Sequence, residues 1–329
     1  MTQRRSWILR IGAFAALAAC AALSAGPAAA QAWPSKPVRL VVPLTAGSGA
    51  DIVARILGRK LQEMWGQPVV VDNKPGAGGQ IGTREVIRAD ADGHTLLIQS
   101  ASHAANVAMY KSLPYDPLKD LVDVALLAKT PYVMVALATG PYKSVKEVVD
   151  RAKNKNPGVF FASAGVGTST HLTAELFADK AGVQMTHVPF KGSPDAINDV
   201  AGGNTAFYMA PLPTVAGMLK DGRLMPIGVT SGKRVATLSQ VPTIAESGYP
   251  TFEAELWVGL WAPAATPPAV LNKLAADVAS ALRSPDVVEQ FAKGGNEAGA
   301  LSPADFAKFV RSEVETNRAL VRKANIPLQ

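Results

Sequence analysis

The stretch "LVVPLTAGSGADIVARIL", residues 40–57, predicts a strand, a loop of small residues and a helix in immediate succession. Residues 38–42 are mostly β-branched or apolar, which favours a strand, and residues 51–65 carry apolar side chains at helical spacing. Ser48 and Asp51 have the Ser-x-x-Asp spacing of a capping box, so the helix is expected to begin there. The loop therefore presents unpaired backbone N–H groups, which favour an anion.

A second loop has the same design. The stretch "FFASAGVGTSTHLTAEL", residues 160–176, again passes from a strand through glycines and hydroxyl side chains into a helix. Neither loop contains Lys or Arg, and the Gly-x-x-x-x-Gly-Lys-Ser/Thr pattern of a phosphate-binding loop is absent from the sequence. Because neutral donors can carry the single charge of a carboxylate, the pair predicts a carboxylate site. The alternative for each loop is an ordinary glycine-rich turn with a helix cap.

Strands and helices alternate from residue 38 onward, which is typical of α/β domains with mainly parallel sheets. We predict a first domain over residues 31–135, a second over 136–252, and a return of residues 253–329 to the first, with a hinge and a central cleft. The closing segment has helix openings at Pro267-Pro268, Ser284-Pro285 and Ser302-Pro303. Further strands are predicted at 69–71, 95–99, 132–137, 159–162, 185–190, 206–209 and 227–230, and further helices at 80–88, 144–156, 170–180, 194–201 and 214–220.

Residues 1–30 have the pattern of an export signal, with three arginines before an apolar run of 13 residues, 11–23, that is too short to span a bilayer. Cleavage is expected after Ala30, which places the mature protein in the periplasm. Two alternatives remain open. Leu17-Ala18-Ala19-Cys20 resembles a lipoprotein cleavage box, which would lipidate Cys20, and Arg4-Arg5 resembles a twin-arginine signal.

The composition excludes several classes of site. Cys20 is the single cysteine, so a chain cut after Ala30 has no disulfide, thiol nucleophile or thiolate metal ligand. The four histidines show no pair at metal-binding spacing, although His171 and Glu175 lie one helical turn apart. Charges are scattered and only 6% of residues are aromatic, which argues against a nucleic-acid surface. The glycines of residues 76–82 follow a turn rather than a strand, so no nucleotide cofactor is expected.

Seven ordered blocks resemble one family over nearly the whole mature chain: the periplasmic receptors of tripartite tricarboxylate transporters, of the Bug or TctC type. The resemblance implies a type II periplasmic-binding-protein fold, no catalysis, a carboxylated ligand such as a di- or tricarboxylate or an aromatic acid, and membrane transporter subunits as partners. A monomer is expected. The blocks are "WPSKPVRLVVPLTAGSGADIVAR", "NKPGAGGQIGTREV", "SLPYDPLKDL", "ASAGVGTSTHLTAELF", "HVPFKGSPDAINDVAGG", "VPTIAESGYPTFE" and "WVGLWAPAATPP".

The resemblance also implies that residues 45–51 and 163–168 hold the ligand carboxylate, partly through water. The first loop departs from the family's usual pair of adjacent glycines. Residues 100–106 and 209–211 are expected to shape the far end of the pocket, with the choice between Ser102 and His103 as a polar contact left open. The predicted ligand-binding residues are Thr45, Ala46, Gly47, Ser48, Ala50, Asp51, Ser102, His103, Ser163, Ala164, Gly165, Gly167, Thr168, His171 and Pro211.

Two other functions fit parts of the same pattern. An exported hydrolase would use Ser163 or Ser48 as its nucleophile, but the sequence shows neither a base nor an orienting acid for them. A ligand sensor would use the same fold to signal to a membrane kinase. Lys191, at a predicted strand end, is expected to be a solvated turn residue.

Overall fold

The stretch that opens the sequence argument forms strand β1 (Val38–Val42) and helix α2 (Gly49–Trp65), as predicted. The structure is a computed structural model that describes residues 33–154, 158–323 and 326–329. Within it, Lys36–Gln329 form one compact unit. The described residues before this unit, 33–35, contain neither helix nor strand. The predicted export signal and Cys20 lie outside the described residues.

The first sheet has the strand order β2-β1-β3-β9-β4, with a short strand β10 also paired to β4. Strand β1 runs parallel to β2 and β3, whereas β9 is antiparallel to both of its neighbours. The antiparallel strand enters from the carboxyl-terminal part of the chain, so residues far apart in sequence complete this sheet. The bounds are β2 Val69–Asn73, β3 Thr95–Ser100, β4 Leu121–Leu137, β9 Glu255–Pro263 and β10 Glu297–Ala298.

The second sheet continues from the same strand β4 in the order β4-β7-β5-β6, and β8 also pairs with β4. Strand β4 changes partners at one point, because Pro131 pairs with Glu255 of β9 and the next residue, Tyr132, pairs with Pro211 of β7. A single continuous strand thus belongs to both sheets. The bounds are β5 Phe160–Ser163, β6 Thr186–Pro189, β7 Phe207–Pro211 and β8 Leu224–Val229.

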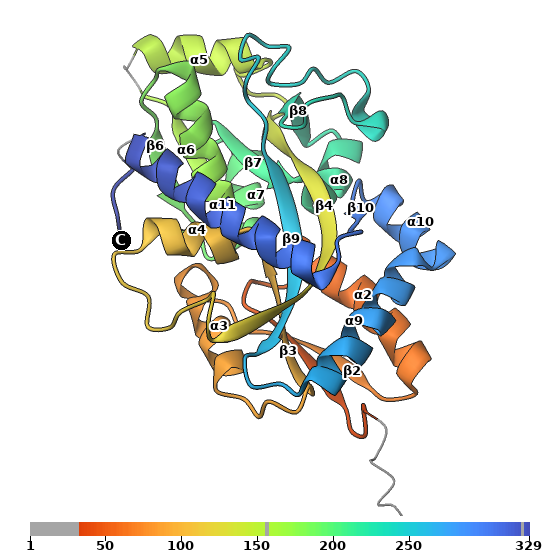
Figure 1. Cartoon of the computed structure of the whole chain (residues 1–329). Helices are drawn as coiled ribbons and strands as arrows, with labels where there is room; N and C mark the ends of the chain where they lie inside the picture. The colour runs from red at the N-terminus through yellow and green to blue at the C-terminus, as the bar shows by residue number, and fades with distance from the viewer. Residues whose placement is uncertain (1–32, 155–157, 324–325) are drawn as a thin grey trace, which may run out of the picture. The chain divides into compact units, whose positions relative to one another are not determined.

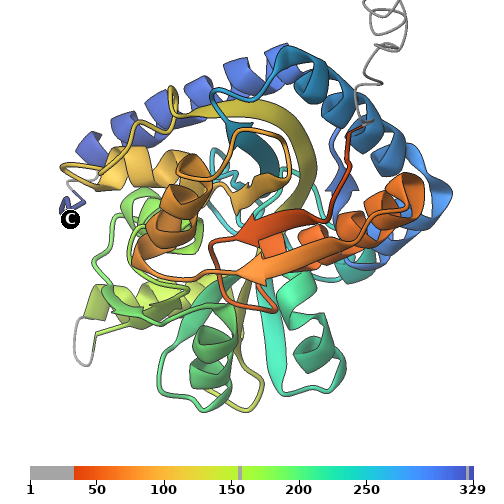
Figure 2. The ribbon, with the colours of Figure 1, turned by 90° about the horizontal axis from the view of Figure 1, so that it is seen from below.

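Helices cover both sheets, and the three at the carboxyl end begin where the prolines predicted (Figure 1). Helices α9 and α10 lie against α2 beside the first sheet, as the view from below also shows (Figure 2). Helix α11 crosses β9, where Trp257 contacts Phe309. The bounds are α3 Gln80–Ile87, α4 Ser102–Met109, α5 Val145–Asn154, α6 Ser169–Ala181, α7 Ser193–Ala201, α8 Leu212–Lys220, α9 Pro268–Arg283, α10 Pro285–Lys293 and α11 Pro303–Lys323, with 3-10 turns η1 Ala77–Gly79 and η2 Ala236–Leu238.

Two elements differ from the prediction. Strand β4 begins at Leu121 rather than at 132, because residues 121–131 pair along β9, a partner more than 100 residues away in sequence. Residues 102–109 form helix α4, which is not among the helices predicted from the sequence. Its seven buried residues pack against the sheet and α11, so tertiary burial stabilises a short helix with little amphipathic character.

In the first sheet β9 runs antiparallel to β3 and β4, and in the second β4 runs antiparallel to β7 and β8, while the other neighbouring strands of the main path are parallel, which confirms the predicted α/β class. None of the helices in the described residues combines the length and apolar character needed to cross a bilayer. The domain boundaries at residues 135 and 252 stay a prediction.

Candidate functional site

The first loop is held in shape by Asp51, which is almost fully buried. Its carboxylate accepts hydrogen bonds from the backbone N–H of Gly47 at 2.9 Å, from Asn73 at 2.9 Å and from Arg55 at 3.0 Å. The Ser48 hydroxyl caps α2 by accepting from the Asp51 N–H at 3.3 Å. The Asp51 carboxylate therefore stabilises the shape of the loop and does not itself face a ligand. The backbone N–H groups of the first turn of α2 have no carbonyl partner within the helix, so they remain available to an anion.

The second loop is also held by internal hydrogen bonds. The Thr168 hydroxyl donates to the Gly165 carbonyl at 2.6 Å and lies 3.0 Å from the Thr170 hydroxyl. The Thr170 hydroxyl in turn accepts from the Ala164 N–H at 3.0 Å. Gly165 and Gly167 have φ angles of 129° and 77°, which other residues rarely adopt. The glycines are therefore required by the turn, and the hydroxyls line its inner side.

The two loops line the same small cavity, where other segments also contact them. The Ser169 N–H at the start of α6 donates to the Ser102 hydroxyl of α4 at 3.0 Å, a bond between the two halves of the fold. A Cβ added at Gly192 would lie only 2.6 Å from Thr45 Cγ2, so the backbone before α7 touches the first loop. Thr45 Oγ1 is buried, and no hydrogen-bond partner for it exists in the described part of the chain.

A small cavity of about 20 Å³ lies where the loops meet, and a groove of about 610 Å³ adjoins it. The cavity contains hydroxyls and helix-start backbone but no ionisable side chain. The groove shares Leu44, Thr45, Ala164 and Thr168 with the cavity and carries Lys191 on its wall. The cavity is lined by Leu44, Thr45, Ser48, Gly49, Ala50, Ser100, Ser102, Ala164, Thr168, Ser169, Thr170, Gly192, Ser193, Pro211 and Leu256.

The structure brings together about half of the predicted binding residues. Seven line the cavity: Thr45, Ser48, Ala50, Ser102, Ala164, Thr168 and Pro211. Gly165 lines the adjoining groove. The others line neither space: Ala46, Gly47, Asp51, His103, Ser163, Gly167 and His171.

The two predicted histidines lie within packed aromatic groups. His103 stacks on Trp261 at 4.4 Å, and burial lowers the pKa of His103 to about 4. His171 stacks on His187 at 3.7 Å. Burial, with a smaller contribution from His171, lowers the pKa of His187 to about 3. The imidazoles of His103 and His187 are therefore neutral near pH 7 and pack as flat side chains.

Ser163 has a histidine neighbour that the sequence analysis did not identify. Its hydroxyl lies 2.6 Å from Nε2 of His187 and accepts the Gly165 N–H at 3.0 Å. Ser163 is fully buried, and no carboxylate among the described residues pairs with His187. The expectation that Ser163 has no base was wrong, since a serine–histidine pair exists, but it lacks the orienting acid and the access that a nucleophile needs.

Several lining residues were missed. Gly192 and Ser193 form a third strand-to-helix turn, between β6 and α7, in the block "VPFKGSPDA". Its glycine and serine repeat the composition of the other two loops, so the sequence does contain a pattern that predicts a third loop at the cavity. Leu256 belongs to β9, and no local sequence pattern predicts that it lines the cavity. No cluster of three or more His, Cys, Asp or Glu side chains in the described ranges could hold a metal ion.

Comparison with known proteins gives consistent matches. The family model described as "Tripartite tricarboxylate transporter family receptor" matches residues 53–326. Protein BugT of Bordetella pertussis is 35% identical over 321 residues, which cover 97% of each chain. The structure of R. palustris Rpa4515 with adipate has a TM-score of 0.87 and 34% identity, covering 90% of this chain and 100% of that chain. MatC (Rpa3494) from Rhodopseudomonas palustris with bound malate has a TM-score of 0.83 and 30% identity, covering 88% and 100%.

Proposed function

Since the chain belongs to the tripartite tricarboxylate transporter receptor family, we propose that it captures a small dicarboxylate between its two loops and delivers it to the membrane subunits of such a transporter. The observation that carries the proposal is the cavity where the two loops meet. It offers hydroxyls and helix-start N–H groups and no ionisable side chain, the donor set that suits a carboxylate. Two similar structures contain adipate and malate, both dicarboxylates.

The sizes of the two spaces suggest how such a ligand lies. The cavity of about 20 Å³ has room for one water-sized group, so one carboxylate or its bridging water fits there. The groove of about 610 Å³ holds the rest of the molecule, and its wall carries Lys191, a cation for a second carboxylate, together with the acidic Asp195. Because the first loop touches the turn before α7, a ligand enters only when these two segments separate.

The proposal includes export to the periplasm under the direction of residues 1–30, action as a monomer, and binding without catalysis. A receptor that signals to a membrane kinase would bind the same ligands, and transport of the ligand by cells that lack this chain would favour that role. The serine–histidine pair favours one test of the hydrolase alternative. Ester turnover that disappears in Ser163→Ala would support an enzyme, and absence of turnover in the parent supports a binding protein.

The test is a thermal-shift panel of adipate, malate, citrate, glutamate, benzoate and glucose. A carboxylate present at about 100 times its Kd adds roughly 2.7 kcal/mol to the free energy of unfolding. Thr168→Val, which removes a hydroxyl from the cavity, should weaken binding about tenfold, a cost typical of a hydrogen bond to a charged group. The matched control is Thr251→Val, an exposed threonine elsewhere, which should leave affinity unchanged. A response to glucose and to no carboxylate would refute the proposal.

A further inference from the structure

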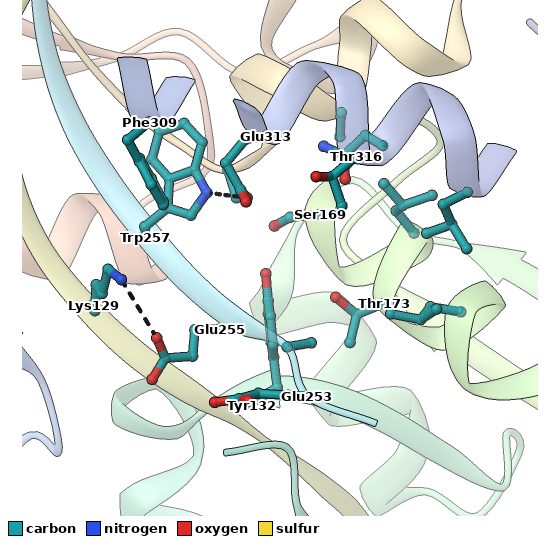
Figure 3. Close-up of a pocket in the computed structure, with 17 residues that line it drawn as sticks. Lys129, Tyr132, Ser169, Thr173, Glu253, Glu255, Trp257, Phe309, Glu313 and Thr316 are labelled. Carbon is teal, nitrogen blue, oxygen red and sulfur yellow. Dashed lines mark hydrogen bonds and ion pairs between the residues drawn. The ribbon is translucent and has the colours of Figure 1, made fainter. Parts of the chain in front are cut away.

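A second cavity, of about 290 Å³, lies beside strands β4 and β9 and has no role in the proposed function (Figure 3). Helix α6 walls it on one side and helix α11 on the other, and strands β4 and β9 form its base. Ser169 is the one residue that it shares with the cavity between the loops. Its volume is close to the lower end of the range for small-molecule sites.

Negative charge dominates the walls of this cavity. Glu253, Glu255 and Glu313 line it, against the single cation Lys129. Lys129 pairs weakly with Glu255, at 3.8 Å. Burial raises the pKa of Glu255 and nearby Glu253 raises it further, while Lys129 acts in the opposite direction. The carboxylates are therefore only partly compensated by the protein's own charges.

One of these carboxylates is oriented by an aromatic neighbour. Glu313 accepts the indole N–H of Trp257 at 2.8 Å through one oxygen. Its other oxygen has no donor among the described residues. A fixed carboxylate with a free oxygen facing a cavity is a suitable acceptor for a charged N–H donor.

The buried hydroxyl of Tyr132 supplies an independent indication of a ligand. Only 1% of Tyr132 is exposed, and its Oη faces the hydroxyls of Ser169 and Thr173 without forming a hydrogen bond of ordinary geometry to any described residue. Figure 3 shows this hydroxyl pointing into the cavity between Glu313 and Thr173. An unpaired buried hydroxyl costs about 1–3 kcal/mol, so a ligand donor placed there is stabilised.

The chemistry of the walls selects the class of cation. Trp257 and Phe309 offer aromatic faces, and Leu172 and Leu320 offer apolar surface. Because Lys129 already lies 5.1 Å from the centre of the Phe309 ring, the charged nitrogen of a ligand is left to the carboxylates, and these walls suit the alkyl chain that bears it. The carboxylates are spread around the cavity, and they form no cluster that could hold a metal ion. We propose that the cavity walled by α6 and α11 binds a small organic ammonium ion, with its nitrogen near Glu313 and Tyr132 and its chain along the apolar wall.

The test uses butane-1,4-diamine as the probe, with butan-1-ol as its uncharged counterpart, titrated calorimetrically into the purified protein at low ionic strength. We expect the diamine to bind and the alcohol not to bind. Glu313→Gln keeps an acceptor for the indole and should weaken diamine binding about tenfold. Tyr132→Phe should weaken it about threefold. Glu289→Gln, an exposed glutamate on α10, removes the same charge elsewhere and should leave affinity within about twofold.

Three results would overturn the proposal: no diamine binding by a folded parent protein, equal weakening in the Glu289→Gln control, or stoichiometric displacement of the diamine by calcium. Adipate and malate are titrated into the same variants. Unchanged dicarboxylate affinity in Glu313→Gln shows that the variant is folded, so failure of this site is distinguishable from failure of the proposed function.

Discussion

Gly192→Ala tests whether close contact between the first loop and the turn before α7 is needed for binding. The backbone at Gly192 is extended, with φ 170° and ψ 177°, a conformation that alanine adopts without strain. The new methyl group would nevertheless lie 2.6 Å from Thr45 Cγ2 and 2.8 Å from Thr45 Cβ, and closer still to Thr45 Oγ1. Ordinary carbon contacts are about 3.5–4.0 Å, so the two segments must separate by roughly 1 Å.

Such overpacking costs about 1–3 kcal/mol. Only the arrangement in which the two segments touch bears this cost, so dicarboxylate affinity should fall by a factor of about 5 to 150, while thermal stability without ligand hardly changes. Calorimetric titration with the dicarboxylate that binds the parent most tightly measures the loss. In a double-mutant cycle with Thr45→Ala, the two effects should be less than additive, because the shortened side chain removes the nearer contacts to Oγ1 and Cγ2 and leaves only the one to Cβ.

The control is Gly217→Ala, since a methyl group at Gly217 of α8 would meet no atom within 4 Å. It should leave affinity unchanged. Affinity within about twofold of the parent in Gly192→Ala itself would show that the two segments do not need to approach this closely in the bound state, and the reasoning would fail.

Ser102→Ala removes the acceptor of the Ser169 N–H and should weaken dicarboxylate binding by about 1 kcal/mol, or roughly fivefold, in the same titration. An unchanged affinity would mean that this hydrogen bond contributes nothing to the free energy of ligand binding. The folded-state pKa of His103, about 4, lies below the ordinary value of 6.5, so its stabilising effect is complete above pH 6.5 and is lost as pH falls toward 4, by up to about 3 kcal/mol. Denaturant unfolding should show this slope, and His103→Gln should reduce it, while the slope that remains includes the contribution of His187, whose pKa is also lowered. An equal slope in the variant would contradict the assignment. Asp51→Ala leaves Arg55 without its carboxylate partner and should lower the free energy of unfolding by about 1–3 kcal/mol, which denaturant unfolding also measures; no loss would show that the loop keeps its shape without these bonds.

Local patterns in the sequence were sufficient for the elements that depend on local chemistry. The helix starts at Pro268, Pro285 and Pro303 follow from proline's tolerance of a first helical turn. The start of α2 follows from the capping spacing at Ser48. The meeting of the first two loops at one cavity followed from the rule that ligands of open α/β sheets lie at the carboxyl ends of strands.

What the sequence could not supply depends on distant pairing. The early start of β4 at Leu121 requires β9 as a partner, and helix α4 requires α11 as a cover. His103 was placed near the ligand because it follows Ser102, but on a helix adjacent residues point in different directions, and its ring turns toward Trp261. Leu256 reaches the cavity only because β9 joins the first sheet between β3 and β4.

The shared strand β4 also determines how the protein denatures. Its residues 121–131 are hydrogen-bonded to β9 and its residues 132–137 to β7 and β8, without a break between them. If either sheet unfolded, β4 would lose the hydrogen bonds of one half of its length, and the other sheet also depends on β4. The two sheets are therefore expected to unfold together. A calorimetric scan should then show one unfolding transition whose van't Hoff enthalpy equals the calorimetric enthalpy. Two domains joined only by flexible linkers would instead show two unfolding transitions.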